Sequence, residues 1–485
     1  MTAETSAILL DDATGTWDAE RFERAVEIAA QHLREQGATV LATRLDNGAA
    51  WVVADAAARR SGVVHLPLPA FFTETQVAHA LRTAGAELLW LPPAAASGGR
   101  IREFAPGLAM REMRTAAAPC GVAMPAGTRI VTFTSGSTGT PKGVCLGASQ
   151  LDAVAHGIGE ATGALGIRRH LCALPLAVLL EHVAGVLAPL ARGATVILRP
   201  LEAVGLGGSS SFDPARLDAT VRATQPHSLI LLPQQLRAWS GWLHAQGLRA
   251  CPSLKLVAVG GAPVGTANLA AARAMGLPAY EGYGLSEGGS VQTLNLPGAD
   301  RPGSAGRPLP HARVRIAADG EIELGGALSL GYLGEPADAR PWRGTGDLGR
   351  LDDDGFLHVT GRKKQVLITA FGRNVSPEWV ETALHQQAAI AQAVVFGDGQ
   401  PRLGAVLWPS SPAIDDAALD AAVARANAQL PDYARIAHWL RGRDAFSPAS
   451  GFATPNGRPL RSAIAAAHAA ALFPAIESGH ETFAR

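Results

Sequence analysis

Between residues 22 and 91, the chain alternates stretches in which apolar side chains recur at helical spacing with short, mostly apolar runs. The first helical stretch carries its apolar side chains at Phe22, Val26, Ile28 and Leu33. The runs that follow cover residues 38–41 and 63–68. Helices alternating with short apolar strands are typical of βα units, so this region predicts a mostly parallel sheet.

The same pattern continues through the middle of the chain. Further apolar runs predict strands at residues 129–133, 194–198, 228–232 and 255–259. The segments between them have helical character, and Asp213 followed by Pro214 predicts one helix start. Asp caps free N–H groups at a helix start, and Pro suits the first helical position. The region as a whole predicts an α/β fold.

From Gly303 onwards, short β-type runs separated by glycines replace the alternating pattern. The runs cover residues 314–317, 321–324 and 356–360. They predict a small β-subdomain. A fresh pattern then begins, with a strand expected at residues 365–369 and a helix opening at Ser376 and Pro377.

The length of 485 residues allows about two to four domains with sizeable cores. We place one boundary after Gly361. Residues 1–361 are expected to form a large α/β domain with mostly parallel sheets and the β-subdomain. Residues 362–485 are expected to form a small α+β C-terminal domain of ordinary size.

The charge balance argues against several classes of partner. With 42 basic and 42 acidic residues the formal net charge is zero, so no overall field attracts nucleic acid or an anionic membrane. The longest apolar region, residues 171–190, is interrupted by Pro175, Glu181 and His182, which argues against a membrane span. The N-terminus lacks a signal-peptide pattern, and the four cysteines lack zinc or disulfide spacing. We therefore expect a cytoplasmic protein.

The most informative segment is residues 134–143, which read TSGSTGTPKG and follow directly after an apolar run. Glycines let backbone N–H groups approach a phosphate, hydroxyls add donors, and the ammonium group of Lys142 neutralises charge. Only four of the 42 basic residues are lysines, so a lysine kept here indicates a specific role. The Walker spacing GxxxxGK[ST] is absent. The segment is either a phosphate-binding loop or a flexible surface turn.

This loop resembles the signature of the adenylate-forming superfamily, which includes acyl-CoA synthetases, adenylation domains of peptide synthetases and luciferases. Further motifs of that superfamily follow in the same order, at residues 280–287, 331–332, 345–347 and 361–364. The resemblance covers essentially the whole chain. It implies an AMP-forming carboxylic acid–CoA ligase that uses ATP, Mg²⁺ and coenzyme A, with the C-terminal domain as a mobile lid.

The resemblance also implies how ATP and its metal are held. Lys142 and the loop would hold the phosphates, through Thr134, Ser135, Gly136, Ser137, Thr138 and Gly139. Glu287 would ligate Mg²⁺ through a hard carboxylate oxygen, with Thr138 or Thr134 nearby. Glu287 and Lys142 are accordingly candidate catalytic residues.

Other positions match the superfamily's binding sites for the nucleoside and the acceptor. Tyr283, followed by Gly284, would stack on adenine, and the turn with Gly261 and Ala262 would contact the base edge. Asp347 would accept hydrogen bonds from the ribose hydroxyls. In the C-terminal domain the matching residues are Arg362 at ribose or α-phosphate, Lys364 at the hinge and Gly372 at the pantetheine tunnel. The alternatives are a core aromatic for Tyr283, turn chemistry for Asp347 and a solvated charge pair for Lys363 and Lys364.

Near the C-terminus the chain departs from the superfamily. The family places a catalytic lysine in an Asn-Gly-Lys segment, whereas this chain has Arg458 after Gly457. A guanidinium keeps the charge but is broad and planar, so the exchange is not conservative at a tightly packed site. Either adenylation survives at a reduced rate, or the protein is specialised or inactive in the first half-reaction.

Residues 174–185 resemble the segment that lines the acid site, in the version found in long-chain fatty acyl-CoA synthetases. Many family members have His where this chain has Val178, and His182 is either a core or a helix-surface residue. The apolar composition favours a fatty or aryl acid as the small substrate. Three outcomes remain open: transfer to CoA, transfer to the phosphopantetheine of an acyl carrier protein, and a catalytically impaired nucleotide- or acyl-binding homologue.

Overall fold

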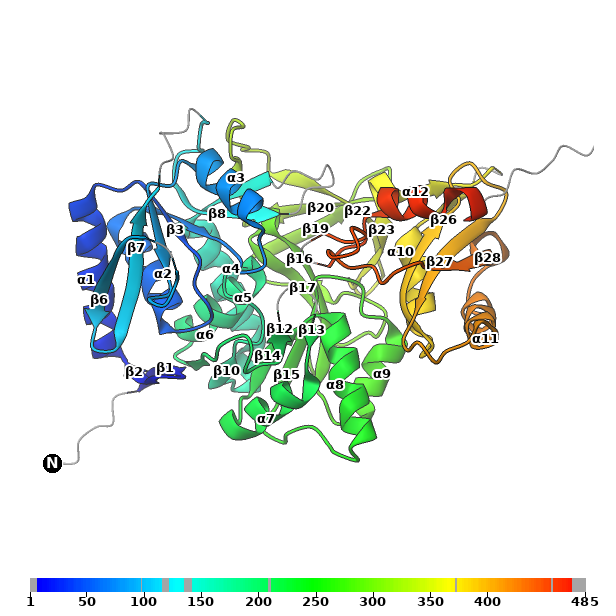
Figure 1. The fold of residues 1–485 in the computed structure, drawn as a ribbon, viewed down its shortest axis with the longest axis horizontal. Helices are drawn as coiled ribbons and strands as arrows, with labels where there is room; N and C mark the ends of the chain where they lie inside the picture. Colours follow the sequence, from blue (N-terminus) through cyan, green and yellow to red (C-terminus); the bar gives the residue numbers. More distant parts are fainter. Residues whose placement is uncertain are drawn as a thin grey trace, which may run out of the picture. The chain divides into compact units, whose positions relative to one another are not determined.

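The chain folds into two compact units, Met1–Val359 and Thr360–Arg485 (Figure 1). The computed structural model describes residues 7–96, 98–115, 122–134, 142–207, 211–370, 373–454 and 457–472. Each unit is an α/β or α+β assembly with its own apolar core. The expected fold class is confirmed.

An eight-stranded sheet in the larger unit has the order β21-β9-β8-β4-β3-β5-β7-β6. Its parallel centre consists of β3 (Val40–Thr43), β4 (Val64–Pro67), β5 (Leu88–Leu91) and β8 (Thr128–Thr134). Antiparallel strands flank the centre: β6 (Arg100–Ala105), β7 (Leu108–Arg114), β9 (Lys142–Gly147) and β21 (Gly331–Tyr332). The apolar runs at residues 38–41, 63–68 and 129–133 correspond to β3, β4 and β8, although β3 begins two residues later than expected.

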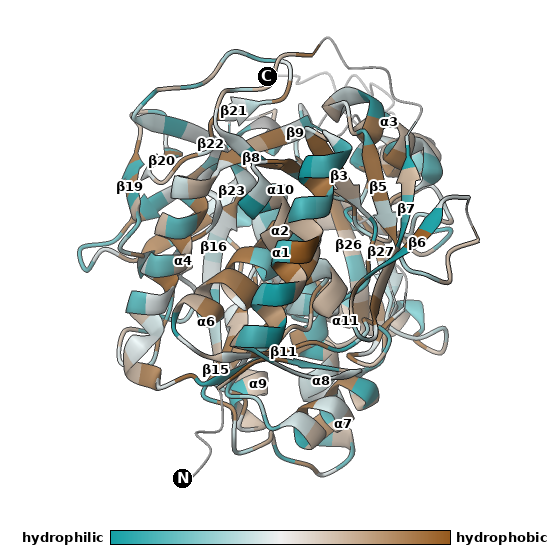
Figure 2. Cartoon of the chain, turned by 90° about the vertical axis from the view of Figure 1, so that its left-hand side faces the viewer, coloured by the Kyte–Doolittle hydropathy of each residue, from teal (hydrophilic) through white to brown (hydrophobic). Residues whose placement is uncertain are grey.

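Helix α1 (Ala19–Gln36) packs against α2 (Ala49–Ser61) with an apolar face, and brown and teal segments alternate along α1 in Figure 2. The buried positions are Phe22, Ala25, Val26, Ala29, Ala30 and Leu33. Ile28 was expected on this face, but it is 51% exposed. At about 100° per residue, Ile28 lies about 200° around the helix from Val26. Small alanines complete the face instead and let the helices approach closely.

A nine-stranded sheet has the order β18-β17-β16-β15-β14-β10-β11-β1-β2, and six strands from β16 to β1 are parallel. Their bounds are β16 (Ala279–Leu285), β15 (Leu256–Val259), β14 (Ser228–Leu231), β10 (Arg169–Leu171), β11 (Thr195–Ile197) and β1 (Ile8–Asp12). The antiparallel edges are β17 (Ser290–Leu294), β18 (Arg307–Pro308) and β2 (Gly15–Asp18). The expected strands at residues 194–198, 228–232 and 255–259 are confirmed as β11, β14 and β15.

The helices of the larger unit cover both sheets. Besides α1 and α2 they are α3 (Glu74–Ala84), α4 (Ala148–Thr162), α5 (Leu179–Glu181), α6 (Ala188–Ala191), α7 (Pro214–Thr224), α8 (Pro233–Ala245) and α9 (Thr266–Ala274). A π-helical segment, His182–Leu187, separates α5 from α6. Helix α7 begins as expected, because the Asp213 carboxylate accepts the Ala215 N–H at 3.0 Å. No helix of the described residues is long and apolar enough to cross a membrane.

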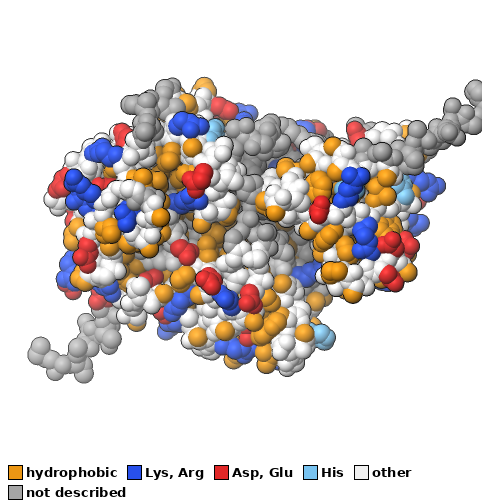
Figure 3. All heavy atoms as spheres, in the orientation of Figure 1, with side chains coloured by type: hydrophobic (Ala, Val, Ile, Leu, Met, Phe, Trp, Pro, Cys, Tyr) orange, Lys and Arg blue, Asp and Glu red, His pale blue; other side chains and the backbone are white. Residues whose placement is uncertain are grey.

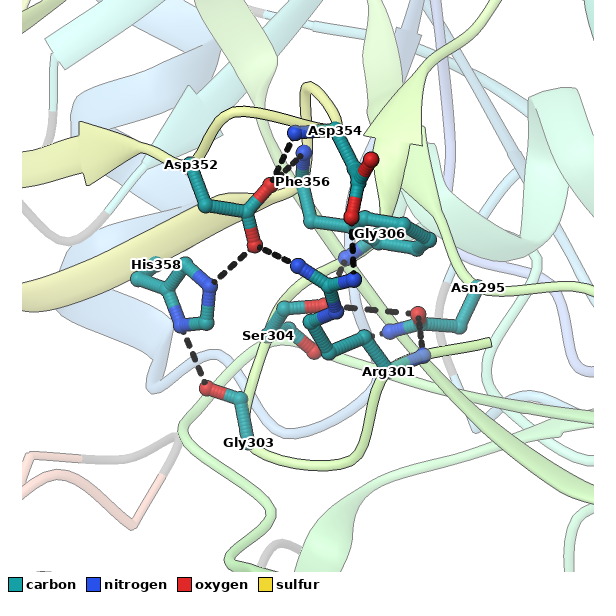
Figure 4. A network of polar contacts seen from close by, with 9 residues as sticks. All are labelled: Asn295, Arg301, Gly303, Ser304, Gly306, Asp352, Asp354, Phe356 and His358. Atoms are coloured by element: carbon teal, nitrogen blue, oxygen red, sulfur yellow. Dashed lines mark hydrogen bonds and ion pairs between the residues drawn. The ribbon is translucent and has the colours of Figure 1, made fainter. Parts of the chain in front are cut away.

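The expected β-subdomain is a four-stranded sheet in the order β19-β20-β22-β23. Its strands are β19 (Ala312–Ile316), β20 (Glu321–Gly326), β22 (Trp342–Leu351) and β23 (Leu357–Arg362). Figure 4 shows how the β22–β23 turn is tied to the loop after β17, because Asp352 accepts from Arg301 of that loop at 2.6 Å. Asp352 also accepts from His358 of β23 at 2.9 Å, and the other ring nitrogen of His358 contacts the carbonyl of Gly303 at 3.2 Å. Oδ1 of Asp352 also accepts the N–H of Phe356 at 2.9 Å. This acidic turn therefore has a structural role.

The smaller unit is built around a three-stranded sheet in the order β26-β27-β28. Its elements are β24 (Leu367–Ile368), β25 (Asn374–Val375), α10 (Pro377–His385), β26 (Ile390–Phe396), β27 (Leu403–Pro409), α11 (Asp416–Asn427), β28 (Ile436–Arg441) and α12 (Arg461–Leu472). Helix α10 begins where expected, after Ser376. The strand expected at residues 365–369 is shorter, because a 3₁₀ turn at Lys363–Gln365 precedes β24. On the face drawn in Figure 3, basic and acidic side chains are interspersed, in keeping with the zero net charge.

Candidate active site

The candidate phosphate loop connects two antiparallel strands, β8 and β9. Thr134 ends β8 and lies opposite Lys142, the first residue of β9. Residues 135–141 lie outside the described residues, and with them the predicted contacts of Ser135, Gly136, Ser137, Thr138 and Gly139. The two described ends thus present a hydroxyl and an ammonium group at one end of a strand pair.

The side chain of Lys142 contacts two residues on or just after β21, Glu335 and Tyr332. Its Nζ lies 3.5 Å from Oε1 of Glu335, and both side chains are 53% exposed. The same Nζ lies 5.1 Å from the centre of the Tyr332 ring. An exposed ion pair of this kind is weak, so an incoming phosphate can replace Glu335 as the partner of Lys142.

Glu287 lies in the 3₁₀ turn Ser286–Gly288 between β16 and β17, and its side chain is partly exposed. The Tyr332 hydroxyl donates to Oε1 of Glu287 at 2.7 Å. Burial, together with the neighbouring Glu287, raises the pKa of Tyr332, so the hydroxyl remains a donor. A partly exposed carboxylate with a fixed orientation fits a hard cation such as Mg²⁺.

Tyr283 and Asp347 meet across two sheets. The Tyr283 hydroxyl on β16 donates to Oδ2 of Asp347 on β22 at 2.7 Å. Asp347 is 4% exposed, and its backbone N–H donates a hydrogen bond to Oγ1 of Thr345 at 3.0 Å. The predicted adenine and ribose residues are therefore direct neighbours. The next residue, Gly284, must be glycine for a packing reason, because a Cβ there would overlap the carbonyl oxygen of Ser290 on β17.

The turn with Gly261 and Ala262 follows the carboxyl end of β15, and both residues are exposed. Gly261 has φ of 84°, a left-handed conformation that favours glycine. Oε1 of Glu281 on the adjacent strand β16 accepts the N–H of Val264 at 3.1 Å and braces this turn. Burial raises the pKa of Glu281 to about 7, although the Val264 hydrogen bond opposes the shift.

The segment expected to line the acid site is fixed by buried polar side chains. Asn47 donates to the carbonyl of Leu174 at 2.8 Å and accepts the N–H of Leu176 at 2.9 Å. Glu181 is fully buried, and its carboxylate contacts His170 at 3.1 Å and accepts the N–H of Leu174 at 2.9 Å. Burial raises the pKa of Glu181, while His170 opposes the shift. The Glu181 carboxylate thus fixes the backbone at Leu174 and is not exposed to a substrate.

His182 is a core residue, which settles the alternative left open by the sequence. It is 1% exposed and contacts Oδ2 of Asp55 on α2 at 3.0 Å. The other oxygen of Asp55 contacts Nδ1 of His65 at 2.7 Å. Burial opposes ionisation of Asp55, but the charges and hydrogen bonds of the two histidines lower its pKa. This buried network ties the π-helical segment to α2 and β4.

The remaining predicted residues belong to the smaller unit. Arg362 is exposed at the end of β23, and Lys364 lies in the 3₁₀ turn that follows. Arg458 is exposed in the loop before α12, where its backbone N–H and carbonyl both bond to Thr454, at 3.1 and 2.8 Å. Gly372 lies outside the described residues.

Comparison with known proteins decides the family. The AMP-binding enzyme family matches residues 2–331, and the AMP-binding enzyme C-terminal domain matches residues 364–471. The chain belongs to the AMP-binding enzyme family. The resemblance stated from the motifs is thereby confirmed.

Three similar proteins place this AMP-binding enzyme among its relatives. It is 43% identical over 154 residues to the long-chain-fatty-acid–CoA ligase FadD15 of Mycobacterium bovis, covering 30% of this chain and 26% of that protein. It is 30% identical over 398 residues, 73% of this chain and 75% of the other, to the 3-[(3aS,4S,7aS)-7a-methyl-1,5-dioxo-octahydro-1H-inden-4-yl]propanoyl:CoA ligase of Mycobacterium tuberculosis. The o-succinylbenzoate CoA synthetase of Bacillus subtilis, solved with its acyl-adenylate, has the same fold, with a TM-score of 0.76, 23% identity and 95% coverage of both chains.

The chain therefore spans about a quarter of the length of the first of these relatives. Within this AMP-binding enzyme, sequence reasoning assigned no role to Tyr332 or Glu335. Tyr332 stands in the motif at residues 331–332 and is one of only four tyrosines, which was a usable signal. Glu335 has no such signal, because its proximity to Lys142 depends on how β21 pairs with β9.

Proposed function

We propose that this AMP-binding enzyme is an AMP-forming carboxylic acid–CoA ligase. The acid carboxylate attacks the α-phosphorus of ATP, and pyrophosphate leaves with the electrons of the broken P–O bond. The CoA thiolate then attacks the carbonyl carbon of the acyl-adenylate, and AMP leaves. The observation that carries the proposal is the pairing of motif residues within the larger unit: Tyr283 with Asp347, and Tyr332 with both Glu287 and Lys142.

The residues of the larger unit would act on the nucleotide. Lys142 and Thr134 would bind the phosphates, and Tyr283 and Asp347 would orient adenine and ribose. Glu287 would hold Mg²⁺, which supplies charge neutralisation for the departing pyrophosphate. Positioned donors of this type act mainly on charge that develops in the transition state, so they raise the rate of adenylation.

We assign nucleotide and acid binding to residues 1–361 and the lid role to residues 362–485. In this assignment Arg362 reaches ribose or α-phosphate oxygens, Lys364 is the hinge residue and Gly372 faces the pantetheine arm. Arg458 takes the place of the lysine that bridges the acyl carboxylate and the α-phosphate. We also propose a cytoplasmic location, which the buried free thiols of Cys145, Cys172 and Cys251 support.

We propose an apolar fatty or aryl acid as the substrate. Residues Leu174, Leu176, Ala177 and Leu179 of the acid-site segment are buried apolar side chains. The carboxylates of this region, on Glu181 and Asp55, are already bonded to histidines in the core. A substrate ammonium group would therefore find no carboxylate partner among them, which favours acids without a charged amine.

The test is acid-dependent exchange of pyrophosphate into ATP, measured over a panel of medium- and long-chain fatty acids and aryl acids. Wild type is compared with Arg458→Lys, which restores the compact ammonium group of the family. We expect exchange by the wild type, and faster exchange by the variant because its smaller head group fits between carboxylate and phosphate. Lys255→Arg is the matched control for an exchange between the two cations, because Lys255 precedes β15 and donates to the backbone carbonyls of Leu165 and Gly166.

The outcomes separate the alternatives. Exchange by the lysine variant alone would mean that Arg458 disables adenylation, leaving a role in binding or in consuming a preformed adenylate. Exchange by neither protein on any acid would overturn the ligase proposal. When exchange is observed, turnover with CoA compared with holo acyl carrier protein identifies the acceptor, since both present the same phosphopantetheine thiol.

A further inference from the structure

Strand β21 brings one side chain, Tyr332, into contact with two groups that the proposed reaction uses. Its hydroxyl donates to Oε1 of Glu287 at 2.7 Å, and its ring centre lies 5.1 Å from Nζ of Lys142. The contact joins segments 45 residues apart in sequence.

The backbone holds Tyr332 in this place. β21 pairs with the edge of β9, the strand that begins with Lys142, and Tyr332 lies opposite Val144 in that pair. The N–H of the next residue, Leu333, bonds to the carbonyl of Gly143 at 2.8 Å. The Tyr332 ring also packs against the apolar cluster that contains Val144 and Leu146. The position of its hydroxyl is therefore set by the sheet.

We propose that Tyr332 is a positioning residue that orients the Glu287 carboxylate and thereby couples metal binding to ATP binding. The inference deepens the proposed function and rests on it. A hydrogen bond to Oε1 restricts rotation of the carboxylate and leaves Oε2 as the oxygen offered to a cation. Among the described residues, none donates a hydrogen bond to Oε2. Loss of an outer hydrogen-bond partner of a metal ligand typically costs about 10- to 100-fold in metal affinity.

The aromatic ring has a separate effect from the hydroxyl. A ring face near an ammonium group attracts it weakly, so the Tyr332 ring helps to hold the ammonium group of Lys142 next to β21. Tyr332→Phe removes the hydroxyl and keeps the ring, its packing and its contact with Lys142. This variant isolates the hydrogen bond to Glu287.

The experiment measures ATP dissociation constants by calorimetry on the full chain, once with excess EDTA and once with excess Mg²⁺. The ratio of the two constants reports how strongly the metal enhances ATP binding. We expect Tyr332→Phe to reduce this ratio about 10- to 100-fold while the metal-free constant stays within two-fold of wild type. Tyr433→Phe, which alters an exposed tyrosine of the smaller unit, should behave as wild type.

An unchanged ratio would overturn the role of Tyr332, whether both constants stay at the wild-type values or both weaken equally, which indicates a purely structural effect. Absence of ATP binding by the wild type under either condition would overturn it together with the ligase proposal. If the wild type shows metal-enhanced ATP binding that Tyr332→Phe loses, but no pyrophosphate exchange, then the ligase proposal fails and the role of Tyr332 stands.

Discussion

Glu281 makes the stability of the larger unit depend on pH in a direction opposite to most carboxylates. The ordinary pKa of a glutamate is 4.5, and burial raises that of Glu281 to about 7. The folded state therefore binds a proton that the unfolded state releases between these values. The stability contribution of the neutral carboxyl is fully present below pH 4.5 and is lost as the pH rises through 7.

Replacement of Glu281 by Gln should remove this dependence. The amide oxygen can still accept the N–H of Val264, but it cannot ionise. A shift from 4.5 to about 7 corresponds to about 3 kcal/mol at 1.36 kcal/mol per unit. Because the side chain is partly exposed and water screens the charge, we expect about 2 kcal/mol. At pH 8 the variant should be more stable than wild type by that amount, and at pH 4.5 the two should be equal.

Urea unfolding followed by tryptophan fluorescence at pH 4.5, 6, 7 and 8 measures the difference. Glu160→Gln is the matched control, because it removes an exposed carboxylate from α4 of the same unit and should leave the pH profile unchanged. The reasoning is refuted if Glu281→Gln is equally displaced from wild type at every pH, or if it is less stable at pH 8.

Two further substitutions probe the contacts around the site. Glu335→Gln removes the ion-pair partner of Lys142 and should lower the KM for ATP by up to about five-fold at low salt, with the difference vanishing at high salt; a KM that rises would contradict a competing role for Glu335. Asp55→Asn breaks the buried contacts to His65 and His182 and should cost about 3 kcal/mol in urea unfolding at pH 7. Because the pKa of Asp55 is lowered in the fold, the loss of stability in Asp55→Asn should shrink as the pH falls below about 4. Asp152→Asn, which removes an exposed ion pair, is the control. A loss of stability that is independent of pH would contradict the ionised state assigned to Asp55.

Several of the strands that were predicted from the sequence lie in the parallel centres of the two large sheets, where they are largely buried. Residues 229–232 and 256–259 are continuous apolar runs because β14 and β15 pair with each other inside the sheet and pack into one apolar cluster. β1 escaped prediction because its residues Ile8–Asp12 end in two acids and it pairs with β11, far along the chain. Ile28 was assigned to the buried face of α1 because apolarity alone does not distinguish a core position from an exposed one.

In the candidate site, too, the sequence identified residues but not their contacts. Motif order and residue type were sufficient to name Lys142, Tyr283, Glu287 and Asp347 as candidates. They carried no information on which of these side chains touch each other. His182 illustrates the limit: its role as a core residue follows from Asp55, which lies 127 residues away in sequence.

The sequence by itself determined the order of the elements, the family motifs and the chemical types available to the site. These are local properties, since a strand run, a helix cap or a glycine-rich turn depends on neighbours within a few residues. The tertiary structure alone decided that Tyr283 donates to Asp347, 64 residues away, and that Tyr332 reaches Glu287, 45 residues away. Such pairings depend on strand register and on the packing of separate sheets, because shifting a strand by one residue turns its side chains to the opposite face.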